Sequence, residues 1–151
     1  MATELRQIDA VDRRLLEELQ ADARLSLAEL GRRVGLSSPA VAERLQRLEG
    51  TGAIRGYRAE VDPKALGYSL TVIIRIRPAP RELKKVADLA RATPEVVECQ
   101  RITGEDCFFM KAHVRDVTHM EELIDRFNPY GVTTTSIAQS APVPLRPIAL
   151  G

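Results

Sequence analysis

The stretch SLAELGRRVGLSSPAVAERLQRLEG, residues 26–50, decides the fold of the N-terminal part of the chain. It begins with the pattern of a helix-capping box, a serine followed three residues later by Glu29, and a short helix with one apolar face runs from there to Gly35. A second helix begins at one of the two serines after this glycine, and Pro39 suits its first turn. Two short helices joined by a glycine-containing turn are typical of a helix-turn-helix.

A further helix precedes this pair. Asp9 is a favourable N-cap residue, and Asp12 places a negative charge near the positive end of the helix dipole. Apolar residues then recur at helical spacing up to about Gln20. The sequence therefore predicts three helices in this half of the chain.

The segment after the helices, residues 54–61, has the composition of a strand that carries two arginines. It is suited either to a wing or to a linker strand, and Asp62 and Pro63 break it. We therefore expect a three-helix, winged helix-turn-helix domain with a linker strand over residues 1–62, and a second domain over residues 63–151.

The second half of the chain changes from a helical period to an alternation of apolar and polar residues. This alternation predicts strands over residues 68–77, 96–103, 107–114 and 132–141. Helical spacing predicts one helix over residues 81–92 and another that begins at a capping box in Thr118–Glu121 and ends at Phe127. The order β-α-β-β-α-β is the ferredoxin-like arrangement, so the expected fold class is α+β.

A sheet of this kind carries its helices on one face only. The other face must meet water or a partner, and we expect Ile73, Phe109 and Ile137 to lie on it. Apolar residues on an uncovered face favour an oligomer. The tail from Pro142 to Gly151 holds three prolines and is expected to be extended.

Arginines gather in one part of the chain, although the net charge is only +1. From Arg24 to Arg58 there are seven arginines and three glutamates. This local excess of positive charge suits a surface that faces DNA phosphates. A solvated face of mixed charge is the alternative interpretation.

Composition argues against a membrane protein and against a metal site. No apolar run approaches the roughly 20 residues of a membrane-spanning helix, and residues 1–7 lack the apolar core of a signal peptide. We therefore expect a cytoplasmic protein with no membrane partner. Cys99 and Cys107 form no metal-binding pattern. We interpret them as free thiols in or near a core, and we expect no metal or cofactor.

The residues of the helix pair and of the segment after it closely resemble the Lrp/AsnC family of leucine-responsive and asparagine-responsive regulators. The two runs that carry the resemblance are AELGRRVGLS, residues 28–37, and VAERLQRLEGTGAIRGY, residues 41–57. Shorter matches lie at Asp9–Asp12, Ala21–Arg24, Thr103–Gly104 and Gly131–Val132. The resemblance covers residues 9–140, and a helix-turn-helix followed by βαββαβ in one short chain is specific to few families.

The resemblance implies DNA binding by the N-terminal domain and dimers built around the C-terminal sheets, often assembled into octamers. It also implies that an amino acid or a related metabolite binds in the C-terminal domain, at or near subunit interfaces. The family's loop commonly has an aspartate three residues after Gly104, where this chain has Cys107, preceded by Glu105 and Asp106. The expected partners are double-stranded DNA, further copies of the chain and a small-molecule effector, in a nucleoid-associated protein.

The second helix of the pair is the candidate recognition helix, whose N-terminal residues would face base edges. An arginine there can bind guanine or a phosphate, and Glu43 would accept a hydrogen bond from a cytosine amino group. Ser37 has the alternative role of a plain N-cap, and Arg44 that of an internal ion pair with a nearby glutamate. The candidate DNA-binding residues are Ser37, Ser38, Ala40, Glu43, Arg44 and Arg47, with Arg32 and Arg55 as contacts to the DNA backbone.

Two polar segments form the candidate effector site. Acidic side chains suit the ammonium group of an amino acid, and hydroxyl and backbone N–H groups suit its carboxylate. The alternative is an ordinary hairpin turn and a threonine-rich strand. The candidate effector-binding residues are Gly104, Glu105, Asp106, Cys107, Thr133, Thr134, Thr135 and Ser136.

These patterns predict a sequence-specific transcriptional regulator that responds to an amino acid or related metabolite. No nucleophile–base pair, metal cluster or phosphate-binding loop is visible, and His113 and His119 are the only histidines, so no catalytic residue is predicted. Two alternatives stay open. One is a sequence-tolerant protein that organises the chromosome, and the other is a tetrapyrrole decarboxylase of similar architecture.

Overall fold

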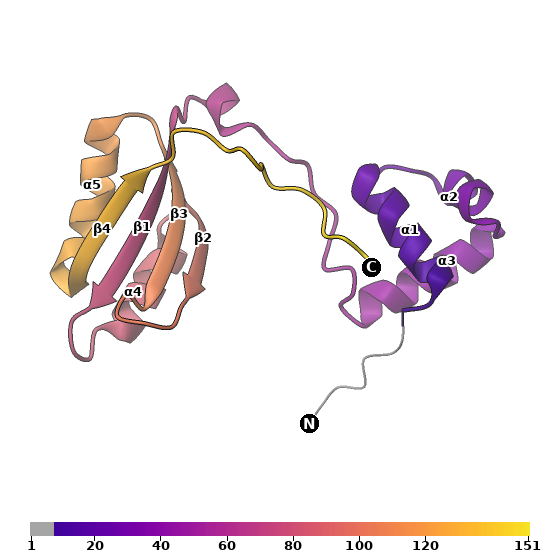
Figure 1. The fold of residues 1–151 in the computed structure, drawn as a ribbon, viewed down its shortest axis with the longest axis horizontal. Helices are drawn as coiled ribbons and strands as arrows, with labels where there is room; N and C mark the ends of the chain where they lie inside the picture. The colour runs from indigo at the N-terminus through magenta and orange to yellow at the C-terminus, as the bar shows by residue number, and fades with distance from the viewer. Residues whose placement is uncertain (1–7) are drawn as a thin grey trace. The chain divides into compact units, whose positions relative to one another are not determined.

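The computed structural model describes residues 8–151, and the polar segment Met1–Gln7 lies outside the described residues. The chain forms two compact units (Figure 1). The first runs to Glu60 and also includes Val143–Gly151, and the second is Val61–Pro142. The tail therefore groups with the first unit, whereas the sequence placed it in the second domain.

The first unit contains the three expected helices, α1 (Ala10–Ala21), α2 (Leu27–Val34) and α3 (Ser38–Gly50). At the start of α1 the Asp9 carboxylate accepts a hydrogen bond from the Asp12 amide at 2.8 Å, and the Asp12 carboxylate accepts one from the Asp9 amide at 3.2 Å. This reciprocal capping satisfies amide groups that have no partner inside the helix. The three helices pack around a small core of Leu15, Leu19, Leu30, Val34 and Val41.

The turn between α2 and α3 depends on two glycines. Gly35 has a φ of 76°, in the left-handed region that glycine adopts without strain. Gly31 is buried, and its carbonyl accepts a hydrogen bond from the Leu36 amide at 2.9 Å. A Cβ at Gly31 would overlap the carbonyl oxygen of Leu36. The close approach at Gly31 therefore sets where α3 begins relative to α2.

The strand expected over residues 54–61, and with it the wing, is absent. The segment is a loop with no strand hydrogen bonds. A strand exists only where a neighbouring strand completes its backbone hydrogen bonds, and the described part of this chain provides none there. The local pattern was therefore not sufficient to predict the element.

The second unit has the expected βαββαβ order, and its strands form one antiparallel sheet in the order β2-β3-β1-β4. The strands end within a few residues of the predicted limits, apart from β4, which stops four residues early. In chain order the elements are the 3₁₀ turn η1 (Pro63–Leu66), β1 (Leu70–Pro78), α4 (Leu83–Ala92), β2 (Val96–Arg101), β3 (Phe108–Val114), α5 (Val117–Phe127), the 3₁₀ turn η2 (Asn128–Tyr130) and β4 (Gly131–Ile137).

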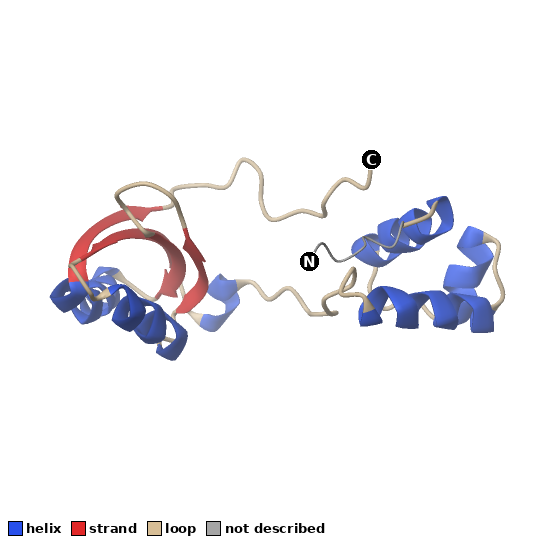
Figure 2. Cartoon of the chain, turned by 90° about the horizontal axis from the view of Figure 1, so that it is seen from below, coloured by secondary structure: helices blue, strands red, loops and turns tan. Residues whose placement is uncertain are grey.

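Helices α4 and α5 cover one face of this sheet (Figure 2). The core between them and the sheet contains Val72, Ile74, Ile76, Val86, Met110, Leu123 and Phe127. Ile73 and Phe109 alternate with these residues and lie on the other face, as expected; we call it the open face. The prediction for Ile137 was wrong, because the register pairs it with Val72, and directly opposed residues share a face.

Helix α5 begins two residues earlier than the sequence suggested. Its N-cap is Asp116, whose carboxylate accepts a hydrogen bond from the His119 amide at 2.8 Å. The capping box predicted from Thr118 is therefore not used. Two candidate caps lie two residues apart, and an aspartate directly after a strand provides the stronger acceptor near the helix dipole.

A buried cluster fixes α5 against the start of β2. The imidazole Nε2 of His119 lies 3.1 Å from a carboxylate oxygen of Glu95, and the Arg126 guanidinium binds the same carboxylate at 3.0 Å. The imidazole Nδ1 accepts the Arg115 amide at 3.2 Å, so the ring proton of the neutral form lies on Nε2 and points to Glu95. Burial raises the pKa of Glu95, but the hydrogen bonds from Arg126 and His119 outweigh it and lower the pKa from 4.5 to about 2.

We predict that Gly31→Ala destabilises the first unit by roughly 1–3 kcal/mol, the range for side chains inserted into filled space. Gly50→Ala is the matched control, because Gly50 is also helical and has open space at its Cβ position. This control should stabilise the protein by about 0.5 kcal/mol. Denaturant unfolding followed by circular dichroism measures both changes, and equal effects of the two variants would contradict the packing role of Gly31.

Candidate functional site

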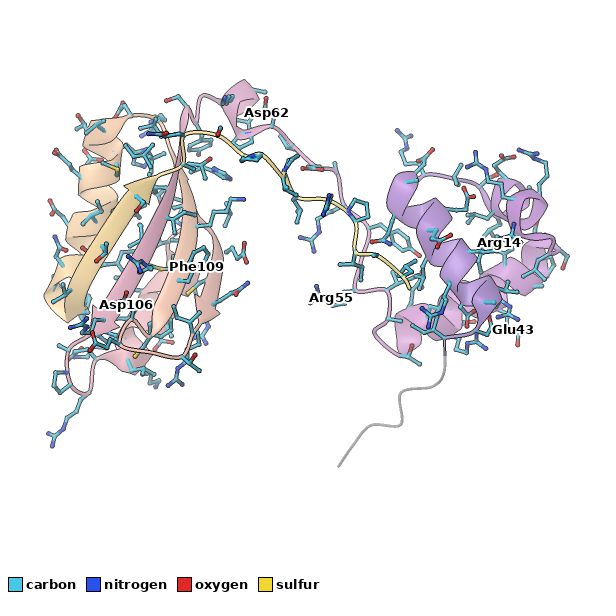
Figure 3. All side chains as sticks on the ribbon, viewed as in Figure 1. Arg14, Glu43, Arg55, Asp62, Asp106 and Phe109 are labelled. Carbon is cyan, nitrogen blue, oxygen red and sulfur yellow. The ribbon has the colours of Figure 1, made fainter. Side chains whose placement is uncertain are left out.

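Helix α3 presents the face that the sequence assigned to DNA. Val41 and Leu48 are buried against the rest of the unit, so the opposite side of the helix is free. The Ser37 hydroxyl accepts a hydrogen bond from the Ala40 amide at 3.4 Å, which confirms Ser37 as the N-cap. The helix positions that are exposed to solvent near this end are Pro39, Glu43 and Gln46, with Ser38 and Ala40 half-buried beside them. Glu43 is labelled in Figure 3.

Two arginines of α3 bind carboxylates at the start of α1. A single guanidinium nitrogen of Arg44 lies 2.6 Å from Asp9 and 2.8 Å from Asp12. A nitrogen of Arg47 lies 2.7 Å from Asp12, whose side chain is only 2% exposed. The hydrogen bond from Arg44 lowers the pKa of Asp9. These ion pairs join α3 to α1.

The internal ion pair that we considered for Arg44 is therefore present, although its partners are two aspartates of α1 and not a glutamate. Arg44 is 26% exposed and Arg47 is 42% exposed. A guanidinium has five N–H donors, so Arg47 keeps donors for a second partner while it binds Asp12. Arg47 is the better placed of the two to contact DNA.

The other arginines between Arg24 and Arg58 differ in their surroundings. Arg32 binds Glu29 at 2.5 Å and stays 72% exposed, and Arg33 bridges Glu29 and Glu18. The hydrogen bonds from Arg32 and Arg33 lower the pKa of Glu29 to about 2. Arg55 is exposed and forms no ion pair among residues 8–151. Part of the positive charge counted along the sequence is thus neutralised within the unit.

The turn between β2 and β3 leaves space for a ligand. The Ile102 amide donates to the Cys107 carbonyl at 2.9 Å and closes the turn. Gly104 has a φ of 108°, and apart from its two chain neighbours no residue among 8–151 has a heavy atom within 4 Å of the position that its Cβ would take. Another molecule can therefore approach the backbone there closely.

Two arginines that the sequence analysis did not select lie beside this turn. Arg75 and Arg77 occupy alternate positions of β1 and point to the open face. Arg75 lies 3.6 Å from Asp106, Arg77 lies 4.0 Å from Asp106, and Arg77 also pairs with Glu105. We call these four residues the charged corner; Asp106 is labelled in Figure 3. The alternation of β1 with Ile74 and Ile76 would have revealed both arginines.

Strand β4 divides the predicted hydroxyl residues between two faces. Thr134 and Ser136 pair with Arg75 and Ile73, so they lie on the open face beside the charged corner. Thr133 and Thr135 pair with Ile76 and Ile74, so they face the helices and cannot reach a ligand on the open face. The hydroxyl of Thr133 instead donates to Asn128 at 3.0 Å.

Cys107 packs against the core of the second unit, and Cys99 is exposed, so only Cys107 lies where the sequence suggested; both thiols are free. A groove of about 630 Å³ between α4 and β2 is lined by Cys99 and Arg101 but by none of the predicted effector residues. Within residues 8–151 no cluster of histidine, cysteine and acidic residues can hold a metal ion. None of the described helices is long and apolar enough to cross a membrane.

Two family models match the chain, one over the helices of the first unit and one over the sheet unit and part of the tail. A model for an AsnC-type helix-turn-helix domain matches residues 8–49, and a model for an Lrp/AsnC ligand binding domain matches residues 71–148. The chain belongs to the Lrp/AsnC family. It is therefore a DNA-binding transcriptional regulator with a domain for a small-molecule ligand, as the sequence predicted.

Individual relatives support the assignment of the chain to the Lrp/AsnC family. The transcriptional regulator LrpC of Bacillus subtilis is 34% identical over 87% of this chain and 91% of LrpC. The leucine-responsive regulatory protein of Escherichia coli is 36% identical over 79% of this chain and 74% of its own length. These relatives are regulators, which confirms that the protein is not an enzyme.

Solved structures of family members have the same fold. The structure of LrpC superposes with a TM-score of 0.85 over 89% of this chain and 96% of LrpC. The regulator NMB0573 of Neisseria meningitidis, solved as a complex with L-methionine, has a TM-score of 0.85, 26% identity, and coverage of 93% of this chain and 94% of NMB0573.

We predict that Arg47→Ala weakens DNA binding without unfolding the first unit, because Arg44 still neutralises Asp12. A base contact by Arg47 would cost roughly 1–3 kcal/mol and relax the preference at one position. If Arg47 contacts a phosphate, its loss would weaken binding to all DNA sequences evenly and reduce the dependence of affinity on salt. Footprinting and salt titrations distinguish the two cases, with Arg91→Ala as the control, because it removes the same charge from an exposed helix position of the second unit. Unchanged affinity would remove Arg47 from the interface.

Proposed function

We propose that this regulator binds specific DNA sequences through the N-terminal part of α3 and responds to an amino acid bound at the charged corner. The observation that carries the proposal is the meeting of two arginines and two carboxylates beside the open turn at Gly104. An amino acid is a zwitterion, and a site with charges of both signs matches both ends of it. The proposal also places the protein on nucleoid DNA.

The geometry supports distinct roles for the four charged residues. The distances of 3.6 and 4.0 Å from Asp106 to the two arginines are longer than hydrogen bonds, so a ligand can separate these pairs at little cost. Asp106 would then accept the ligand ammonium, and Arg75 would bind its carboxylate, with the Thr134 hydroxyl as a further donor. Glu105 is mostly exposed and would form the rim.

The class of ligand is supported by the comparison with NMB0573, whose structure contains L-methionine. The chemistry of the site favours the same class, because neither a purely anionic nor a purely cationic ligand would satisfy both pairs of charges. The charged corner recognises only the groups that all amino acids share, so it does not select among their side chains.

The open face supports assembly of the protein into oligomers. Ile73 and Phe109 lie on it, and α4 and α5 both pack on the opposite face. A second copy that covers this face would remove apolar surface from water. We propose a homodimer built in this way, further assembled into an octamer, with the effector bound between subunits. A ligand that favours one packing of subunits then changes the spacing of the DNA-binding units.

We predict that the protein is at least dimeric at micromolar concentration, because a monomer would leave Ile73 and Phe109 half-exposed. Light scattering coupled to size exclusion measures the mass. Phe109→Asp places a charge on the open face and should shift the population toward monomer, whereas Lys84→Asp on α4 should not. A wild-type monomer would contradict the assignment of the open face.

We predict that a thermal-shift screen of the twenty amino acids identifies at least one that raises the melting temperature, because a ligand that binds only the native state stabilises it. Gly104→Asp should abolish this shift and the effector response, while operator binding without effector stays nearly unchanged. Gly67→Asp is the matched control, since it adds the same charge at another positive-φ glycine. A normal response of Gly104→Asp would place the pocket elsewhere.

A further inference from the structure

The outer side of α1 carries two polar side chains that the DNA-binding surface does not use. Arg13 and Gln20 are seven residues apart, two turns of helix, so they lie on the same side of α1. Both are exposed, and Leu15 and Leu19 point from the other side into the core. This side of α1 therefore faces away from the neighbouring helices.

The C-terminal segment Val143–Gly151 groups with the first unit, and its last residues contact this side of α1. The side-chain amide of Gln20 donates to the Ile148 carbonyl at 3.1 Å and accepts from the Ile148 amide at 3.0 Å. Seven residues earlier on α1, the Arg13 guanidinium donates to the Leu150 carbonyl. The segment thus runs antiparallel to α1 and is bound at two points.

The chemistry of this contact recognises an extended backbone. A glutamine side chain ends in the same donor and acceptor as a peptide unit, so two hydrogen bonds to one residue reproduce the pairing of neighbouring strands. Pro144 and Pro147 restrict the backbone of the segment even when it is not bound, and this reduces the entropy that docking costs. The contact depends on Gln20, on Arg13 and on the shape of the backbone, and not on the apolar side chains of the segment.

The C-terminal segment follows β4 closely in the chain, so it connects the proposed effector site to α1. Strand β4 carries Thr134 and Ser136 beside the charged corner, and only Ala138–Pro142 separates β4 from the segment that is bound to α1. The Ala138 amide donates to the Thr71 carbonyl at 2.9 Å and extends the pairing of β4 with β1. We propose that α1 is the docking surface for the chain's own C-terminal segment, and that this segment carries the effector signal from β4 to α1. The signalling part rests on the proposed effector site.

The attachment is weak enough to be switched. Leu145 and Ile148 remain 85% and 74% exposed, so docking buries little apolar surface. Hydrogen bonds exposed to water contribute little net free energy, and ordering the segment opposes them. A segment with bound and free states of similar free energy responds to a small bias at β4.

Cross-linking tests the docking surface and its occupant. Cysteines at Glu17→Cys, between the two contact residues on α1, and at Ala149→Cys, between the two contacted carbonyls, leave Arg13 and Gln20 intact. In a chain with Cys99→Ser and Cys107→Ser, a short bifunctional thiol reagent should join them within one chain. Adding Gln20→Ala should greatly reduce the yield, and pairing Ala149→Cys with Glu43→Cys on the outer side of α3 should give none.

The mass of the product decides between the outcomes. A product with the mass of one chain supports the proposal, and a product with the mass of two chains would overturn the assignment of the chain's own segment. A yield no higher than that of the Glu43→Cys control would overturn the docking surface. Hydrogen exchange at the Ile148 amide, in the protein with its natural cysteines, gives an independent reading, since Gln20→Ala should accelerate it and Glu17→Ala should not.

The signalling role is tested on the full chain with its natural cysteines. The amino acid with the largest thermal shift in the screen is the probe, and operator affinity is measured with and without it. Gln20→Ala should keep the thermal shift but bring the ratio of the two affinities close to one, whereas Glu17→Ala should keep the ratio of the wild type. A wild-type ratio in Gln20→Ala would overturn the signalling role. If no amino acid raises the melting temperature of the wild-type protein, the proposed effector site and the signalling role are both overturned. The cross-linking result would still stand.

Discussion

The alternation of side chains along β1 is the constraint on which the second unit depends. Strand β1 is bonded on one edge to β3 and on the other to β4, so its two faces are the two faces of the sheet. Val72, Ile74 and Ile76 enter the core beneath α4 and α5, and this forces Ile73, Arg75 and Arg77 to the open face. One strand thereby separates the residues that stabilise the unit from those available to a ligand or a second copy. A shift of one residue in its pairing would exchange the two sets.

Most features that depend on near neighbours were predicted from the sequence, apart from the cap of α5, and several features that depend on distant partners were not. The caps at Asp9, Ser26 and Ser37 and the turn at Gly35 act within a few residues, so their patterns were sufficient. The strand over residues 54–61 failed because a strand needs a partner, and the face of Ile137 failed because it follows from the register of β4 on β1. Only the fold brings Asp12, 32 residues away, to Arg44. Of the charged corner, the sequence predicted the two acids, because they lie in a recognisable turn. The two arginines were missed, because they lie in a strand that was recognised by its apolar residues.

The ion pairs of the first unit change what its arginine content means for DNA binding. The segment between Arg24 and Arg58 has four more arginines than glutamates, but Asp9 and Asp12 on α1 take up Arg44 and part of Arg47. Fewer free charges mean weaker attraction to any phosphate backbone, and this favours a protein that depends on base contacts for its affinity. A sequence-tolerant chromosome-organising protein would benefit from the opposite arrangement. The ratio of specific to nonspecific affinity at one salt concentration separates these two functions.

The cluster that joins α5 to the start of β2 has a consequence for acidic conditions. A carboxyl group whose pKa is about 2 in the folded protein and 4.5 as a free side chain favours folding fully above 4.5. That contribution is lost progressively as the pH falls from 4.5 to about 2, where Glu95 of the folded protein takes up a proton. The ammonium and carboxylate of a free amino acid are both charged across the range from weakly acidic to neutral pH. Glu95 therefore keeps its charge at every pH at which the proposed effector is a zwitterion. In acid, the carboxylate of the effector and the Glu95 carboxylate that stabilises the fold would both be protonated.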